Sequence, residues 1–157
     1  MESEVFSADV LEMNTLGNGI FKQDGCVIFC IGAVDGDRIQ ARITSSRKNY
    51  KLAEMVSCDV ASSHRCEPSC PVFDSCGGCT LQHITYAHEI QIKKASVEAA
   101  LRRAGLGKIS VEEILTADPV RYRNKAVYHF SGNGKISFLQ ESSDQYVQVT
   151  DCQLCPP

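Results

Sequence analysis

The 157-residue sequence has no long apolar run and no secretory signal. A membrane-spanning helix needs about 20 consecutive apolar residues, and no stretch approaches that length. The acidic start Met1-Glu2-Ser3-Glu4 also lacks the basic and then apolar pattern of a signal peptide. These absences predict a cytoplasmic protein with no membrane partner, and we expect it to be a monomer.

A glycine-rich turn between a strand and a helix, the mark of a nucleotide-binding α/β domain, is also missing. At this length the chain can hold one ordinary domain or two small ones. Its 43% hydrophobic and 22% charged residues are typical of a globular protein. The sequence therefore predicts one or two compact domains without a nucleotide-cofactor fold.

Acidic residues are absent from two basic windows, although the net charge of the chain is −3. The first window contains Arg38, Arg42, Arg47, Lys48 and Lys51, and the second contains Arg121, Arg123, Lys125 and Lys135. Basic runs usually form no more than a solvated face. Cations segregated in this way also suit phosphate binding, so nucleic acid is a candidate partner.

Residues 1–60 show the pattern of a small β domain. Residues 4–13 predict one strand, and residues 20–23 and 26–31 flank Asp24-Gly25, a strong signal for a two-residue hairpin. Residues 38–44 alternate apolar and polar side chains, as in a strand with one buried face. Short strands with glycine-rich turns favour an OB-like five-stranded β-barrel, since closure removes exposed edges. Tyr50, within the first basic window, offers a ring for stacking on an RNA base.

The strongest signal is a C-x5-C-x2-C motif formed by Cys70, Cys76 and Cys79. Three thiolates within ten residues can wrap a polynuclear iron–sulfur centre. Gly77 and Gly78 would let the backbone approach the inorganic sulfides of that centre and donate N–H groups to them. The motif therefore favours a cluster-binding loop.

The fourth ligand of such a centre must come from outside the motif, because four thiolates usually complete a cluster. Cys152 is the best candidate and Cys155 is the second. Tetrahedral zinc is an alternative, since Cys76/Cys79 and Cys152/Cys155 form two C-x2-C pairs, but zinc would leave Cys70 without a role. A redox pair at Cys76 and Cys79 would need a βαβ setting that the sequence does not resemble.

The other cysteines have simpler interpretations. Cys26, Cys30 and Cys58 fall in or near predicted strands, and we interpret them as small buried apolar residues. Cys66 lies near the motif, but the cluster does not require it. The odd total of nine cysteines argues against a fully paired disulfide framework.

A helix follows the cysteine motif. Apolar residues recur at helical spacing between Thr85, a candidate N-cap, and Gly105, which suits the left-handed residue that ends a helix. The stripe includes Ile90, Val97 and Leu101. We expect this amphipathic helix to pack on the cysteine region.

Beyond Ile109 the pattern returns to strands. Residues 123–130 and 135–140 flank Asn133-Gly134 as a hairpin, and residues 146–149 predict a further strand that leads to Cys152. The segment Arg121-Tyr122-Arg123-Asn124-Lys125 combines cations, an amide and an aromatic ring, which suits contacts to RNA phosphates and bases. An exposed start of a strand with solvated charges is the alternative. The whole chain is thus expected to be mainly β, or α+β.

Together these motifs resemble the RumA-like RNA uracil-5-methyltransferases. Cys70-Pro71, Cys76-Gly77-Gly78-Cys79 and Gln82-His83 resemble the family's iron–sulfur signature. Arg121-Tyr122-Arg123-Asn124-Lys125-Ala126 resembles its next block, and Val149-Thr150-Asp151-Cys152 resembles the place of its fourth cluster cysteine. Residues 1–60 resemble its TRAM domain, a small RNA-binding barrel. The resemblance covers essentially the whole chain in order.

The resemblance implies a TRAM barrel over residues 1–60 and an iron–sulfur-binding α+β central domain over residues 61–157. It implies a [4Fe–4S] cluster on Cys70, Cys76, Cys79 and Cys152, which we interpret as a structural staple. The RNA-binding candidates are Arg38, Arg42, Arg47, Lys48, Lys51, Arg121, Arg123, Asn124 and Lys125. Ribosomal RNA is favoured as the partner over transfer RNA.

In this family a further domain binds S-adenosylmethionine and supplies the catalytic cysteine and an acidic base. These residues contain no match to that domain, so we expect no catalytic residue here, an incomplete central domain, and RNA binding without methyl transfer. Two rival classes are a stand-alone zinc- or cluster-binding RNA module and a methylthiotransferase-like radical enzyme. The second rival has a C-x3-C-x2-C motif and its barrel at the other end of the chain, and both features point away from it.

Overall fold

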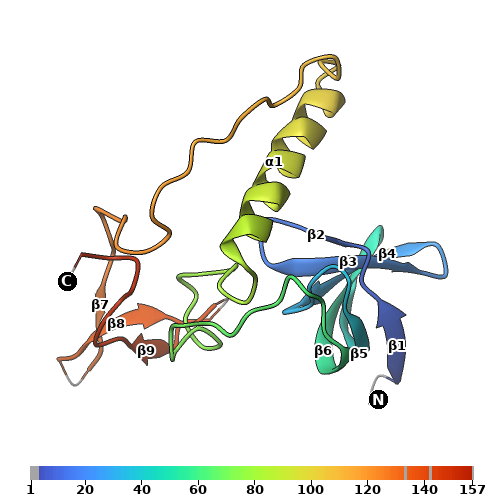
Figure 1. The fold of residues 1–157 in the computed structure, drawn as a ribbon. Coiled ribbons are helices and arrows are strands. Elements are labelled where there is room, and N and C mark those ends of the chain that lie inside the picture. The colour runs from blue at the N-terminus through green and yellow to red at the C-terminus, as the bar shows by residue number, and fades with distance from the viewer. Residues whose placement is uncertain (1–3, 133, 142, 157) are drawn as a thin grey trace.

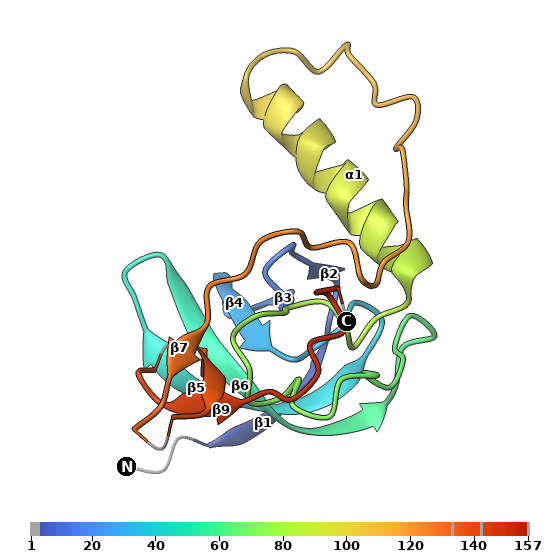
Figure 2. The ribbon, with the colours of Figure 1, turned by 90° about the vertical axis from the view of Figure 1, so that its left-hand side faces the viewer.

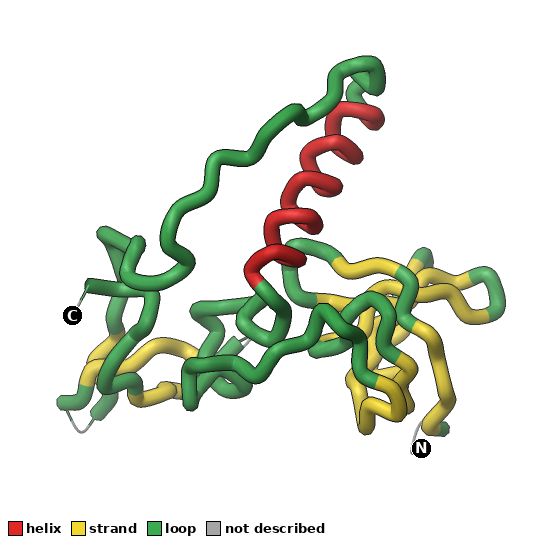
Figure 3. Tube along the Cα trace, in the orientation of Figure 1, coloured by secondary structure: helices red, strands yellow, loops and turns green. Residues whose placement is uncertain are grey.

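The computed structural model describes residues 4–132, 134–141 and 143–156, and the fold is mainly β. A curled six-stranded sheet is followed by one helix and by a small antiparallel sheet of three strands (Figure 1). Loop segments fill much of the second half of the chain, above all between the helix and the second sheet (Figure 3). The mainly β class predicted from the sequence is confirmed.

The first sheet contains β1 (Val5–Asp9), β2 (Glu12–Met13), β3 (Asn18–Gln23), β4 (Cys26–Ile31), β5 (Arg38–Ser46) and β6 (Tyr50–Val60). Its strand order is β1-β5-β6-β4-β3-β2, and the only parallel pair in this sheet is β4 with β6. We expected a closed barrel of five strands, but the structure has a curled sheet of six whose edges are β1 and β2. Residues 4–13, predicted as one strand, form two, and β6 lies in no predicted range. The N–H of Val10 donates toward Asp37 beside β5, but the next N–H, of Leu11, donates to Ile20 in β3. The chain therefore divides there into two edge strands.

Local signals in this sheet behave as the sequence predicts. Asp24 and Gly25 have φ angles of 50° and 75°, which a two-residue type I′ turn requires. Ile39 and Ala41 of β5 are fully buried, as their alternation predicts. The register between β5 and β6 shifts at three places, and such bulges increase the twist that curls a sheet.

The core of the first sheet contains one of the cysteines predicted to be buried. The buried side chains are Val10, Phe21, Ile28, Cys30, Ala33, Ile39, Ala41 and Ala53. Burial, with a smaller contribution from Glu54, raises the pKa of the Cys30 thiol to about 12, so this thiol stays protonated. Cys26 is half-buried. Cys58 is exposed, which corrects our interpretation, because it lies in the half of β6 that extends beyond β4.

Asp37 is the buried polar group that joins this sheet to the segment after it. Its side chain is almost fully buried and accepts hydrogen bonds from the N–H groups of Val34 (2.7 Å) and Ser62 (2.8 Å). The guanidinium of Arg65 reaches the same carboxylate at 2.6 Å and also donates to Gly32 O at 2.7 Å. Burial opposes ionisation, but these hydrogen bonds outweigh it and hold the pKa of Asp37 below its ordinary value.

Helix α1 (Tyr86–Arg103) has the predicted ends but not the predicted packing. Thr85 caps its first turn by accepting from His88 N–H, and Gly105 has a φ of 76° just beyond its end. Only the first turns are buried, where Ile92 packs with Val34 and Ile84, while Val97 is 52% exposed. We expected the helix to pack on the cysteine region. It does so only at its start, where Ile92 lies near Ile84 and Leu81, and its later turns project from the molecule (Figures 1 and 2).

The length and polarity of α1 also bear on membranes. In the part of the chain that the structure describes, no helix combines the length and the apolar character that crossing a bilayer requires.

The second sheet contains β7 (His129–Phe130), β8 (Ile136–Leu139) and β9 (Tyr146–Gln148) in the order β7-β8-β9. The predicted hairpin is present, and Asn133 of its turn lies outside the described residues. The prediction of a strand over residues 123–130 is wrong except for its last two residues, which form β7. The reason is that the N–H groups of Arg121 and Arg123 donate to the carbonyls of Gln153 and Leu154, both at 2.8 Å, and so pair one loop with another.

Replacing Asp37 by alanine is expected to lower the free energy of unfolding by about 3 kcal/mol or more, because it leaves Arg65 without its buried partner. Denaturant unfolding followed by circular dichroism measures this loss. The matched control is Asp9→Ala, which removes an exposed ion pair with Arg38 (2.9 Å) and should leave the free energy of unfolding almost unchanged, because solvent screens an exposed pair. Equal losses in the two variants would contradict a structural role for the Asp37 network.

Candidate metal centre

The four predicted ligand cysteines line one cavity. Cys70, Cys76 and Cys79 come from the loop between β6 and α1, and Cys152 comes from the loop after β9. The rest of the lining is mostly apolar and consists of Val72, Phe73, Gly78, Gln82, Arg123, Phe138, Val149, Gln153 and Leu154. The fold thus brings together thiols that lie far apart in the sequence, within a shell that limits access of water.

The loop from Cys70 to Cys79 is shaped by its own backbone and by β8. The N–H groups of Phe73 and Cys76 donate to Cys70 O (3.1 Å) and Val72 O (2.8 Å), which winds the loop into turns. The N–H of Gly77 donates to Leu139 O at 3.0 Å. We expected this N–H to face inorganic sulfide, and the structure corrects that expectation because the bond to β8 uses it.

Gly77 is required by the close approach of two segments. A Cβ at this position would lie 3.0 Å from the backbone N of Glu141 and 3.1 Å from Leu139 O. Both distances are tighter than nine in ten real Cβ contacts, and backbone atoms cannot easily move away. Gly78 lines the cavity, where a Cβ would lie 3.4 Å from Cys76 Sγ, so its suggested role beside the sulfides stays a prediction.

Arg121 holds the loop that carries Cys152. Its guanidinium forms two parallel hydrogen bonds of 2.7 Å with the Asp151 carboxylate and donates to the carbonyls of Cys152 and Cys155, each at 3.0 Å. The hydrogen bond from Arg121 lowers the pKa of Asp151 below its ordinary value. Sequence reasoning assigned Arg121 to RNA, but in the structure its donors are turned to this loop.

A second connection joins the two cysteine-bearing loops directly. Gln153, next to Cys152, donates through Nε2 to Ser69 O at 2.8 Å, and Ser69 Oγ donates to Gln153 Oε1 at 2.5 Å. Ser69 precedes Cys70. The reciprocal pair therefore fixes the two cysteine-bearing loops to each other beside the cavity, which Gln153 lines.

Two polar side chains favour negative charge on the sulfurs. Gln82 Nε2 donates to Cys79 Sγ at 3.2 Å, and Arg123 lines the same cavity. Burial raises the pKa of the Cys79 thiol, and Cys76 and Cys152 add to that rise, whereas Gln82 and Arg123 act in the opposite direction. The thiol is thus protonated at neutral pH without a metal, and a metal ion would displace its proton.

The two remaining candidates lie outside the cavity. Cys155 is buried, and its thiol forms a hydrogen bond with Tyr128 that raises the pKa of that phenol. Cys66 is exposed and its thiol donates to Gln82 O at 3.5 Å. Among the described residues, no three cysteine sulfurs lie as close together as the ligands of a single metal ion.

The first basic window divides into paired and unpaired cations. Arg38 pairs with Asp9 at 2.9 Å, and Arg42 pairs with Glu54 at 3.3 Å. The other members of the window, around the β5–β6 turn, are Arg47, Lys48 and Lys51, and they form no salt bridge with any described residue.

Two further candidates for RNA contact are also exposed, and a nearby ring is already packed. Asn124 and Lys125 lie in the loop before β7 and face solvent. Tyr50 at the start of β6 packs edge-on against Phe29, with ring centroids 5.6 Å apart, and remains 38% exposed. The two basic windows of the sequence thus contribute exposed polar groups from two separate loops.

The fold and the cavity define a mainly β protein with a candidate thiolate metal centre. No protein-family model matches the chain. It is 37% identical over 140 residues to an uncharacterized RNA methyltransferase of Listeria innocua, which covers 87% of this chain and 31% of that protein. It is 34% identical over 152 residues to the 23S rRNA (uracil(1939)-C(5))-methyltransferase RlmD of Acidithiobacillus ferrooxidans, with 92% and 34% covered.

A solved structure has the same fold. The tRNA (uracil-54, C5)-methyltransferase of Pyrococcus abyssi, in complex with S-adenosyl-L-homocysteine, superposes with a TM-score of 0.66 at 19% identity. The match covers 96% of this chain and 33% of that one. The chain is therefore homologous to the N-terminal region of the RNA uracil-5-methyltransferases, and it spans about a third of the length of the curated relatives it matches.

Gly77→Ala is expected to separate the cysteine loop from β8, because its Cβ would press on backbone atoms of Leu139 and Glu141. Amide hydrogen exchange at position 77 and in β8 should become faster by at least tenfold. Gly132→Ala is the matched control, since a Cβ there meets nothing within 4 Å. Unchanged protection in Gly77→Ala would mean that this contact does not hold the loop.

Proposed function

We propose that this chain is the RNA-binding and [4Fe–4S]-binding N-terminal region of an RNA (uracil-C5)-methyltransferase. One observation carries this function: four thiols from two remote segments line a single cavity, in a chain homologous to such methyltransferases. Thiolates are the ligands that iron–sulfur clusters take. Cys70, Cys76, Cys79 and Cys152 would hold the cluster.

Zinc is the weaker alternative for this cavity. A tetrahedral zinc site holds its sulfurs about 2.3 Å from one ion, so the sulfurs lie close to one another. The four cysteines line a common cavity, but among the described residues no three of their sulfurs lie close enough together to share one ion. This spacing suits a larger, polynuclear centre. A zinc site built from two C-x2-C pairs would also need Cys155 rather than Cys70, and the cavity is lined by Cys70 and not by Cys155.

The cluster would act as a structural staple. When bound, it supplies metal–thiolate bonds that close the long loop between Cys79 and Cys152. Arg121 and the Ser69–Gln153 pair orient the loops that carry the ligands. Gln82 and Arg123 would stabilise the negative charge of the bound sulfurs, and the apolar lining would keep water from them.

The first sheet would act as the RNA-binding part. We assign residues 1–60 to a TRAM barrel and residues 61–157 to the cluster-binding central domain. The leading contacts to phosphate are the exposed cations Arg47 and Lys48, the half-buried Lys51 beside them, and the exposed loop of Asn124 and Lys125. Arg38 and Arg42 contribute less because carboxylates already neutralise them, and Arg121 and Arg123 serve the cysteine cavity.

The substrate of the whole enzyme would be ribosomal RNA. Support comes from the relatives named for 23S rRNA at 34% and 32% identity, against 19% for the structure named for tRNA. The site for S-adenosylmethionine and the catalytic residues would lie in the part of the relatives that these residues do not match.

If the chain binds a cluster, we expect it to contain iron and acid-labile sulfide in near-equal amounts when it is purified without oxygen. Changing Cys70, Cys76, Cys79 or Cys152 to serine should remove most of the iron and the visible absorption, because three thiolates hold a cluster poorly. Metal analysis and absorption spectroscopy measure both.

Cys66→Ser and Cys155→Ser are the matched controls and should keep their iron. Colourless protein that holds zinc, and keeps it in Cys70→Ser, would contradict the cluster and favour a zinc-binding RNA module. Loss of iron in the Cys155 variant alone would move the fourth ligand to that residue.

A variant with Arg47, Lys48 and Lys51 all changed to alanine should bind single-stranded, uridine-containing RNA more weakly. Removing one cation from a phosphate lowers the slope of log affinity against log salt by about 0.7, so removing all three should lower it by about 2. Fluorescence anisotropy over a series of salt concentrations measures this slope. Lys108→Ala, beyond the end of α1, is the control, and an equal slope in the triple variant and the wild type would exclude these contacts.

A further inference from the structure

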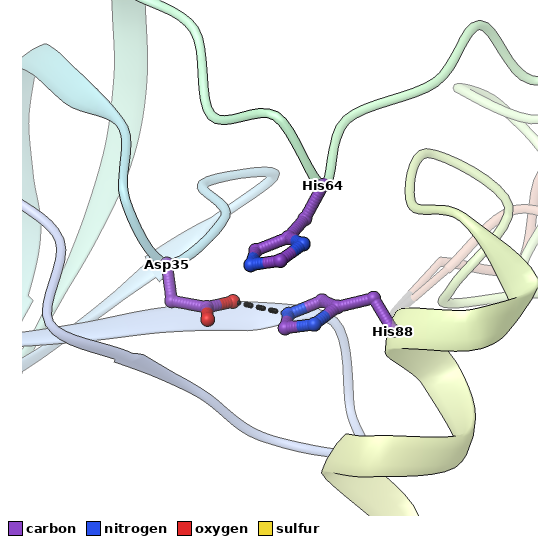
Figure 4. A group of neighbouring side chains, drawn as sticks. All are labelled: Asp35, His64 and His88. Carbon is purple, nitrogen blue, oxygen red and sulfur yellow. Dashed lines mark hydrogen bonds and ion pairs between the residues drawn. The ribbon is translucent and has the colours of Figure 1, made fainter.

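Three metal-ligating side chains meet outside the cysteine cavity (Figure 4). Asp35 lies in the loop between β4 and β5, His64 lies in the segment after β6, and His88 lies in the first turn of α1. Their ligand atoms all lie within 4.8 Å of one another. None of the three lines the cavity of the cysteines, so the group is a separate feature of the molecule.

His88 is held between two oxygen atoms. Its ring is 5% exposed, with Nε2 at 2.7 Å from Asp35 Oδ1 and Nδ1 at 3.2 Å from Gln91 Oε1. A neutral imidazole has one N–H, so it can donate to only one of these oxygens. With the proton on Nδ1 and Gln91 as its acceptor, the lone pair of Nε2 faces a carboxylate. In that tautomer a second proton or a metal ion has to lie between them, whereas the other neutral tautomer donates its Nε2–H to Asp35 directly.

His64 supplies a second imidazole at the same place. Its ring stacks on that of His88 with centroids 3.8 Å apart and an interplanar angle of 0°. In the described part of the chain, its ring nitrogens form no hydrogen bond. Two protonated rings in face-to-face contact would repel each other, so protonation cannot satisfy both histidines. One cation can be shared by the carboxylate and both imidazoles once the His64 ring turns out of the stack, because a metal ion lies in the plane of each ring that binds it and two parallel, stacked planes share no point.

We propose that Asp35, His64 and His88 bind one divalent transition-metal ion of the zinc class. Two imidazoles and one carboxylate are a frequent ligand set for zinc, and water completes the coordination. With a metal ion on Nε2, the proton of His88 lies on Nδ1 and is donated to Gln91 Oε1, the outer contact that orients a metal-binding histidine. The ion connects the β4–β5 loop, the segment after β6 and α1, and it fixes the start of the helix on the first sheet.

The test is a zinc titration of the full chain with its thiols reduced, followed by the ring ¹⁵N resonances of the histidines. After the thiols are saturated, the resonances of His64 and His88 should shift together and saturate with one further zinc ion, and those of His129 should not move. Cobalt(II) distinguishes this site from the cysteines, because sulfur ligands add a strong charge-transfer band in the near ultraviolet that nitrogen and oxygen ligands do not.

His64→Gln and Asp35→Asn should each abolish the shift, and His129→Gln should leave it intact. His64→Gln keeps the contact between His88 and Asp35, so this variant still tests the metal site even where Asp35→Asn fails to fold. Two protonated nitrogens on His88 with no response to zinc would overturn the proposal in favour of an imidazolium–carboxylate pair. A full response in His64→Gln would overturn it as well. Neither outcome depends on the iron content of the cysteine site, so this test is independent of the test of the cluster.

Discussion

The return of residues 151–155 onto the cysteine loop is the constraint on which the second half of the molecule depends. Few regular elements are available there, since β7, β8 and β9 are short and α1 projects away from them. Backbone and side-chain hydrogen bonds hold the segments together instead. Arg121 binds the carbonyls of Cys152 and Cys155, Gln153 pairs with Ser69, and Gly77 donates to β8. These bonds converge on the cavity that the thiols line.

The segment between β6 and α1 connects this region to the first sheet. Arg65 binds Asp37 inside the sheet, and the same Arg65 forms an isolated bridge with Ile84 just before α1. Gly17 approaches the cysteine loop so closely that a Cβ there would lie 2.2 Å from Thr80 O. The candidate thiolate centre and the Asp35–His64–His88 group both draw ligands from this segment, so its course determines both.

Whether a cation of this protein is available to bind RNA depends on its neighbouring carboxylates and not on the net charge of the chain. The net charge of −3 conceals cations of very different availability. Some are neutralised within the fold, as Arg38 is by Asp9 and Arg121 is by Asp151. Others, such as Lys48 and Lys125, stay exposed. Exposed cations can exchange counterions for phosphate, whereas paired ones must first give up a carboxylate.

The sequence by itself determined the features that depend on near neighbours. The Asp24-Gly25 turn, the Thr85 cap and the Gly105 end follow from backbone preferences that act within a few residues. The spacing of the cysteine motif likewise predicted three residues that line the cavity, and the need for a fourth thiolate already made Cys152 the best candidate, which the resemblance to a family supported. Only the tertiary structure decided the partners of Arg121, the bond from Gln82 to Cys79, the exposure of Val97 and the meeting of His64 with His88. These depend on which loops and faces come together across the chain, and no local pattern encodes that.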